Sequence, residues 1–266
     1  MKSSVVKIGC CGFPVARKRY FATFKLVEIQ QTFYKLPSEA TLRKWREEAP
    51  ADFEFTVKAW QVVTHPPSSP TWRKAGIKVE PGKEDRYGLL KPTPENFRAW
   101  EKTVEAAKIL GAKIIVVQTP PSFKYTKDNL QNAIEFFSRA RRDGIIVAWE
   151  PRGDWHEHPD AIREIVERTN IVHVVDLLRR EPVIVSTGIV YARLHGLGGR
   201  EVNYRYKYTD EDLVRLANKV VNIVRECDIE QVYILFNNIY MFDDAKRFRE
   251  TLLEVIKKSH VGVDVM

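Results

Sequence analysis

Ile145-Ile-Val-Ala-Trp-Glu150-Pro-Arg152-Gly-Asp154-Trp155-His156 is the segment that says most about how this chain folds. Its apolar run is too short for a helix and has the length of a strand buried on both faces. It ends in a carboxylate, a guanidinium and an indole. Similar apolar runs end in polar groups elsewhere: Val116-Val117 before Gln118, Val174-Val175 before Asp176, Val190-Tyr191-Ala192 before Arg193 and His195, and Ile234-Leu235-Phe236 before Asn237 and Asn238. This recurrence between helical segments predicts a parallel α/β barrel, in which strand interiors form the core and strand carboxyl ends present the chemistry.

The whole chain supplies eight strands of this kind, separated by segments with helical periodicity. We expect them at residues 5–9, 26–34, 53–57, 113–118, 145–150, 171–175, 189–193 and 231–236. Helix starts are marked by Thr93-Pro94-Glu95 and by the capping-box-like pair Thr209 and Asp212. A length of 266 residues is normal for one barrel. The prediction is therefore a single α/β domain with a (β/α)8 fold over residues 1–266.

One long segment, residues 66–92, breaks the periodicity after the third strand. It is rich in proline and glycine, and its basic residues outnumber its acidic ones. Long loops in compact domains are usually functional or disordered. Because it follows a strand end, we expect it to rise from the catalytic face, either as a basic lid that guides a substrate or as a passive surface insertion.

Composition favours anionic partners. The net charge is +8, with 29% charged residues, which suits phosphates, nucleotides or nucleic acid. Alternatively, the charges belong to the surface of a thermostable protein, with which the few Met and Cys residues agree. Three cysteines without a disulfide or metal pattern, no signal peptide and no apolar run of about 20 residues predict a cytoplasmic protein outside the membrane. The sequence gives no oligomeric state.

Several motifs, in order along nearly the whole chain, resemble one known family. They are Val27-Glu28 through Thr32-Phe33-Tyr34-Lys35-Leu36-Pro37, Phe53-Glu54-Phe55-Thr56-Val57-Lys58 with Thr64-His65, Gln118-Thr119-Pro120-Pro121, Trp149-Glu150-Pro151-Arg152, Val174-Val175-Asp176, Tyr191-Ala192-Arg193-Leu194-His195-Gly196 and Phe236-Asn237-Asn238. The chain thus resembles the domain of unknown function 72 family, the YecE-like proteins. The resemblance implies a TIM-barrel-like fold and little about activity.

The candidate site gathers the polar groups that follow the strands. The catalytic candidates are Glu150, Asp176, Glu28 and His195, and the substrate-binding candidates are Arg152, Arg193, Lys58, Gln118, Asn237, Asn238, Tyr34, Trp155, Gly198 and Gly199. Two carboxylates, one protonated by burial and one ionised, could perform acid and base catalysis at a glycosidic bond. The alternative is an ion-pair network, Glu150 with Arg152 or Arg193 and Glu28 with Lys58, that only prevents charges from being buried alone.

Some of the predicted site residues favour a bound metal, and others favour a bound anion. Glu150, Asp176 and His195 could ligate Mg²⁺, Mn²⁺ or Zn²⁺, but Arg152 and Arg193 would repel a divalent cation and suit a phosphate or carboxylate. We therefore expect no cofactor, with a divalent metal as the alternative. The turn 196–200 could bind phosphate through backbone N–H groups. The alternating Tyr and basic residues at 204–208 could stack on bases or sugars, or form an ordinary exposed strand.

These features predict a metal-independent hydrolase or lyase acting on an anionic glycosyl substrate, such as a nucleotide, a sugar phosphate or a nucleoside within nucleic acid. Glu150 is the leading acid/base group, with Asp176 or Glu28 as its partner. Two alternatives stay open. One is a metal-dependent barrel isomerase or phosphodiesterase, and the other is a non-catalytic protein that binds nucleotides or nucleic acid, with affinity that falls steeply with salt.

Overall fold

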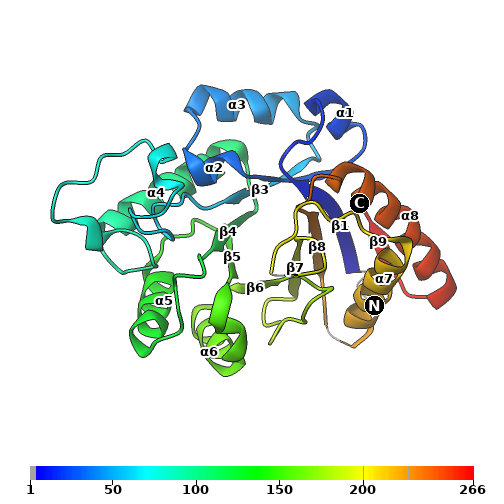
Figure 1. The fold of residues 1–266 in the computed structure, drawn as a ribbon. Coiled ribbons are helices and arrows are strands. Elements are labelled where there is room, and N and C mark those ends of the chain that lie inside the picture. Colours follow the sequence, from blue (N-terminus) through cyan, green and yellow to red (C-terminus); the bar gives the residue numbers. More distant parts are fainter. Residues whose placement is uncertain (1–3, 200, 227) are drawn as a thin grey trace. The chain divides into compact units, whose positions relative to one another are not determined.

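The computed structural model describes residues 4–199, 201–226 and 228–266. Arg200 of the glycine-rich turn and Cys227 lie outside these residues. The strand order is β2-β3-β4-β5-β6-β7-β8-β1-β9, and β1 also pairs with β2, so eight parallel strands close into a TIM barrel. Helices follow most of the strands (Figure 1), but residues 176–188, between β6 and β7, form no helix. The predicted fold class is confirmed. Contacts group the chain into two compact units, a terminal unit (Met1–Glu28 and His173–Met266) and a central unit (Ile29–Val172).

The central unit contains the strands β3 (Glu54–Lys58), β4 (Ile114–Gln118) and β5 (Ile146–Glu150). Its helices are α2 (Gln31–Tyr34), α3 (Glu39–Glu48), α4 (Pro94–Leu110), α5 (Lys127–Arg139) and α6 (Pro159–Thr169), with 3-10 turns η1 (Trp72–Lys74), η2 (Glu84–Arg86) and η3 (Gly153–Glu157). The strand β6 (Val172–Val175) begins at Val172, the last residue of the central unit. The Thr93 side chain accepts a hydrogen bond from Asn96 N, Pro94 starts α4, and Gly111 ends it with a left-handed backbone, as the sequence predicts.

The terminal unit holds β1 (Ser4–Cys11), most of β2 (Leu26–Ile29), β7 (Ile189–Leu194), β8 (Gln231–Phe236) and β9 (Val263–Val265). Its helices are α1 (Arg17–Phe21), α7 (Asp210–Glu226) and α8 (Met241–Ser259). β1 pairs with β2, β8 and β9, and β7 pairs with β8 in parallel register. The strand β9 is an addition to the eight that the sequence predicts. The capping box at α7 is confirmed, since Asp212 N donates to Thr209 Oγ1 and Thr209 N donates to Asp212 Oδ2.

The expected strand at 26–34 was too long. β2 ends at Ile29, and Gln31–Tyr34 forms the short helix α2. The hydroxyl of Thr32 lies 3.1 Å from Ile29 O and 2.6 Å from Lys58 O, both of them acceptors. Threonine side chains that bond to nearby backbone in this way compete with strand pairing. The chain therefore leaves the strand before Phe33 and Tyr34, which lie in the helix α2.

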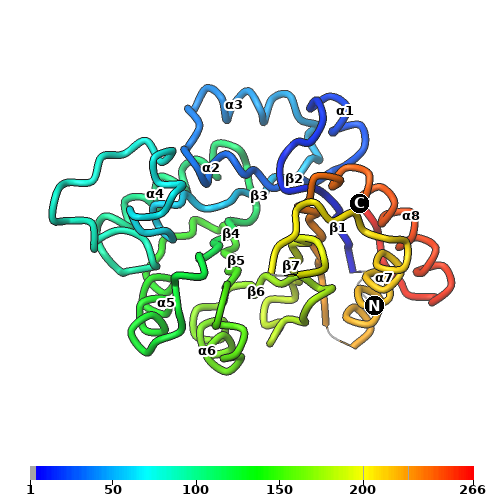
Figure 2. The backbone as a smooth tube through the Cα atoms, viewed as in Figure 1, coloured from blue at the N-terminus to red at the C-terminus, as the bar shows by residue number. Residues whose placement is uncertain are grey.

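The 66–92 segment belongs to the central unit and appears as the long cyan excursion near α4 in Figure 2. Asn96 accepts from Gly88 N at 3.0 Å and donates to Gly88 O at 3.0 Å and to Lys91 O at 2.9 Å. Gly88, Leu89 and Leu90 also donate backbone hydrogen bonds to 62–64. The second half of the segment is thus held by buried hydrogen bonds. Within the residues described here, no helix is both long and apolar enough to cross a membrane.

Candidate active site

In the central unit, four predicted site residues follow one another around the strand ends. β4 and β5 are in register with Gln118 opposite Glu150. Lys58 Nζ, at the end of β3, donates to Gln118 Oε1 at 2.8 Å. Arg152 donates to Glu150 Oε1 at 2.7 Å, and their side chains are 6% and 5% exposed. Lys58, Gln118, Glu150 and Arg152 form the group that we call the β3–β5 cluster.

The charges of the β3–β5 cluster favour an anion. Lys58 and Arg152 carry two positive charges against the single negative charge of Glu150 when that group is ionised. The Gln118 amide is oriented by Lys58, because its oxygen accepts from the ammonium and its NH₂ must then face elsewhere as a donor. A buried carboxylate beside a guanidinium and an amide donor can exchange a proton with a bound anionic substrate.

His65 and Phe33 border this cluster, and neither was among the predicted site residues. The Lys58 ammonium lies 4.0 Å from the centre of the Phe33 ring, and the His65 ring packs edge-on against Phe33. His65 Nδ1 is 2.8 Å from Thr64 Oγ1. Burial and, secondarily, the charge of Lys58 lower the pKa of His65 to about 3, so the imidazole is neutral at pH 7. The Thr64-His65 pair after strand three was the available sequence signal.

Two predicted substrate contacts in the central unit have different surroundings. Trp155 is fully buried, stacks on Phe123 and donates its indole N–H to Phe123 O. We therefore correct its assignment from substrate contact to aromatic core. Tyr34 is 40% exposed, with the Lys74 ammonium 5.0 Å from its ring centre, and its substrate role stays a prediction.

In the terminal unit, Glu28 and Arg193 form a completely buried ion pair. Arg193 Nη2 lies 2.9 Å from Glu28 Oε1, and neither side chain has any exposed area. Tyr191 donates its hydroxyl hydrogen to Glu28 Oε2 at 2.8 Å. A guanidinium enclosed with a carboxylate is not presented to solvent, so this structure gives no support to Arg193 as an anion clamp. The pair fits the alternative in which ion pairs keep charges from being buried alone.

A second group in the terminal unit surrounds Asp176. Its carboxylate accepts from the backbone N–H groups of Leu178 at 3.0 Å and His195 at 3.1 Å, and Arg179 Nε is 3.7 Å from Oδ2. The His195 ring lies 3.1 Å from the amide nitrogen of Asn237. Asp176, His195 and Asn237 are thus brought together, as the sequence predicts for strands six to eight.

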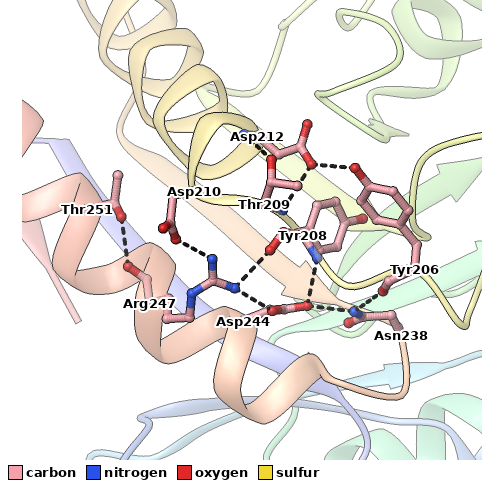
Figure 3. A network of polar contacts seen from close by, with 9 residues as sticks. All are labelled: Tyr206, Tyr208, Thr209, Asp210, Asp212, Asn238, Asp244, Arg247 and Thr251. Atoms are coloured by element: carbon pink, nitrogen blue, oxygen red, sulfur yellow. Dashed lines mark hydrogen bonds and ion pairs between the residues drawn. The ribbon is translucent and has the colours of Figure 1, made fainter.

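Asn238 belongs to a separate network that sequence reasoning missed (Figure 3). Its amide donates to Asp244 Oδ2 at 2.7 Å and to Tyr206 O at 2.8 Å. Arg247 donates to the other oxygen of Asp244 at 3.0 Å, and burial raises the pKa of the Asp244 carboxyl. These contacts attach the loop before α7 to α8. We therefore assign Asn238 to loop positioning in place of substrate contact.

The glycine-rich turn contains one buried glycine, Gly196, and two exposed glycines, Gly198 and Gly199. Gly196 has φ +82°, and a Cβ there would lie 2.1 Å from Asn203 O, so only glycine fits. Gly198 and Gly199 also have positive φ and are exposed. The following 204–208 segment is a loop and not a strand: Tyr204 is 48% exposed while Tyr208 is buried. An anion site at Gly198 and Gly199 stays a prediction.

Among the described residues, no three His, Cys, Asp or Glu side chains lie close enough together to hold a metal ion. Glu150 belongs to the central unit, whereas Glu28, Asp176 and His195 belong to the terminal unit. Their convergence on one site, and the expected Glu28–Lys58 pair, would join the two units and stay predictions.

Comparison with known proteins identifies relatives across nearly the whole chain. The family model described as "Protein of unknown function DUF72" matches residues 16–263. The UPF0759 protein YunF of Bacillus subtilis is 23% identical over 270 residues, which cover 92% of this chain and 87% of that protein.

Solved structures show the same fold. A DUF72 family protein from Thermotoga maritima is 26% identical with a TM-score of 0.65, covering 94% of this chain and 99% of that one. Endonuclease IV from Thermus thermophilus has a TM-score of 0.53 at 12% identity, covering 94% and 99%. At such low identity the second likeness concerns the fold alone.

Proposed function

Since this chain belongs to the family described as "Protein of unknown function DUF72", we propose a function from its site: a metal-independent hydrolase or lyase that acts on an anionic glycosyl substrate. The substrate class is a nucleotide, a sugar phosphate or a nucleoside within nucleic acid. The observation that carries the proposal is the Glu150–Arg152 pair, 2.7 Å apart and nearly enclosed at the end of β5, beside Lys58 and Gln118.

Each group of the β3–β5 cluster has a separate part in this reaction. Arg152 and Lys58 bind the phosphate of the substrate, and the planar guanidinium gives the bidentate contact. Gln118 donates its amide hydrogen to a substrate oxygen. Glu150 moves the proton at the bond that breaks. The two cations would repel a divalent ion placed beside Glu150.

The test is turnover with EDTA present. The substrate panel contains nucleoside monophosphates, pentose and hexose phosphates, and a short oligodeoxynucleotide. Glu150→Gln keeps the shape of the side chain but cannot exchange the proton, so kcat should fall by about 10²- to 10⁴-fold while circular dichroism stays that of the wild type. Arg152→Lys should mainly raise KM, because the bidentate contact is lost.

Glu135→Gln is the matched control, since Glu135 sits in an exposed i,i+4 pair with Arg139 on α5. It should leave kcat and KM unchanged. Undiminished turnover by Glu150→Gln removes Glu150 from the mechanism. Activity that needs added Mn²⁺ or Zn²⁺ would establish the metal-dependent alternative, and salt-sensitive binding without product would establish the non-catalytic one.

A further inference from the structure

His65 lies in the turn that follows β3, and its ring is held in place by the central unit. The backbone N–H groups of Thr64 and His65 both donate to Gln61 O, at 3.1 and 2.8 Å. The imidazole packs edge-on against Phe33, with ring centres 5.0 Å apart, and His65 is 9% exposed. The ring is therefore oriented before any ligand arrives, which reduces the entropy lost on binding.

The Thr64 hydroxyl decides which nitrogen of His65 carries the hydrogen. Thr64 is 1% exposed, and its Oγ1 atom, 2.8 Å from His65 Nδ1, makes no other hydrogen bond among the described residues. If Nδ1 carried the hydrogen, the hydroxyl hydrogen would be buried without an acceptor, which is costly. If the hydroxyl donates to Nδ1, both groups are satisfied. Since the ring is neutral at pH 7, its single N–H hydrogen then lies on Nε2.

The Nε2–H group of His65 is open to a ligand. Among the described residues it has no hydrogen-bond partner, and they do not enclose it, so water or a ligand can reach it. A ring nitrogen that carries a hydrogen has no free lone pair, so it can neither ligate a metal nor accept a proton. What His65 offers at this edge of the ring is one hydrogen-bond donor.

Lys58 adds a positive charge near this donor. Its ammonium lies 4.0 Å from the centre of the Phe33 ring, the same ring against which His65 packs. After burial, the charge of Lys58 is the second cause that lowers the pKa of His65. Lys58 and the Nε2–H group are both donors, and the Gln118 amide oriented by Lys58 is a third. A ligand that satisfies these groups must present acceptor oxygens, and the lysine favours an anionic one.

We propose that His65 is a substrate-binding residue whose neutral Nε2–H group donates to an oxygen of the anionic substrate next to Lys58. The inference rests on the proposed function and adds a binding residue to the β3–β5 cluster from the turn after β3. A donor that is fixed in advance adds a directed contact to the charge of Lys58, and such contacts stabilise negative charge on the oxygen that they face.

The first measurement is the tautomer of His65. Two-bond ¹H–¹⁵N correlation spectra of the ¹⁵N-labelled full chain at pH 7 distinguish an Nε2–H ring from an Nδ1–H ring. The chain has six histidines, and His65→Gln identifies the His65 signals by their loss. We expect the Nε2–H form, and a mixture of both forms in Thr64→Val, which lacks the hydroxyl. Thr169→Val is the matched control, because its buried hydroxyl donates to Ile165 O in α6; it should leave the His65 signals unchanged.

The second measurement adds inorganic phosphate, the anionic group shared by the substrates of the proposed function. We expect the Nε2 signal of His65 to move and the signals of His260, which is exposed, to stay in place. By calorimetry, His65→Leu should weaken phosphate binding about 10- to 100-fold, the effect of one hydrogen bond to a charged group. His65→Gln should retain most of the affinity, because its amide N–H can donate instead.

The proposal is overturned if His65 is the Nδ1–H form or is charged at pH 7, if phosphate leaves its Nε2 signal in place, or if His65→Leu binds phosphate as tightly as the wild type. Turnover of the substrate panel separates this result from the proposed function. A chain that turns over none of the panel while phosphate still moves the His65 signal keeps the anion donor and loses the hydrolase or lyase. Turnover by a chain whose His65 signal phosphate leaves in place keeps the enzyme and refutes the donor.

Discussion

Replacing Arg193 by methionine tests whether the buried pair in the terminal unit serves stability. Arg193 and Glu28 are 2.9 Å apart with no exposed side-chain area, so the variant leaves a carboxylate in the interior without its guanidinium. Breaking a buried ion pair on one side costs about 3–5 kcal/mol. With an unfolding entropy of about 2.1 cal/mol/K per residue, a chain of 266 residues should lose about 5–9 °C in Tm.

The assay is urea unfolding followed by circular dichroism, supported by calorimetry. Arg139→Met is the matched control, because Arg139 and Glu135 are 2.6 Å apart but 57% and 40% exposed; an exposed pair of this kind contributes at most about 1 kcal/mol. The double variant Glu28→Gln with Arg193→Met should recover part of the loss, because it removes the buried charge as well. If Arg193→Met costs no more than the control, the reasoning is refuted and Arg193 is again a candidate for substrate binding.

Two further predictions concern the central unit. His65 has its pKa lowered to about 3 from 6.5; because the unfolded chain binds the proton more readily, stability should fall as the pH is lowered from 6.5 toward 3, by up to about 1.4 kcal/mol per pH unit. Urea unfolding across that range should show a weaker pH dependence in His65→Gln, and an NMR titration in which His65 protonates near pH 6.5 would contradict this. Asn96→Ala removes three hydrogen bonds to Gly88 and Lys91 and should destabilise the chain by about 2–4 kcal/mol and expose the 66–92 segment to trypsin. Unchanged cleavage there would show that other contacts hold the segment.

The contacts that hold the 66–92 segment bear on whether it is a lid or a passive insertion. Its second half is held to 62–64 by backbone hydrogen bonds and to α4 by Asn96. Motion of the whole segment would break these buried contacts. Its five prolines and three glycines are consistent with a fixed, irregular path.

The sequence by itself determined the barrel and the position of most polar groups at strand ends. Buried strands read as continuous apolar runs, and helix caps such as Thr93 and the Thr209–Asp212 box depend on neighbouring residues, so local pattern suffices. The register of β4 and β5, with Gln118 opposite Glu150, follows from the same strand ends. For this reason the Glu150–Arg152 pair, only two residues apart, was foreseeable as one of two options.

The tertiary structure alone decided which distant groups become partners and which become core. Arg193 lies against Glu28 and Tyr191, Trp155 lies under Phe123, and Asn238 bonds to Asp244. Strand register and close packing select these contacts among side chains that all follow strands and all look alike in sequence. The path of the 66–92 segment has the same origin, because hydrogen bonds to Asn96 of α4 hold an irregular stretch whose backbone no local sequence pattern determines.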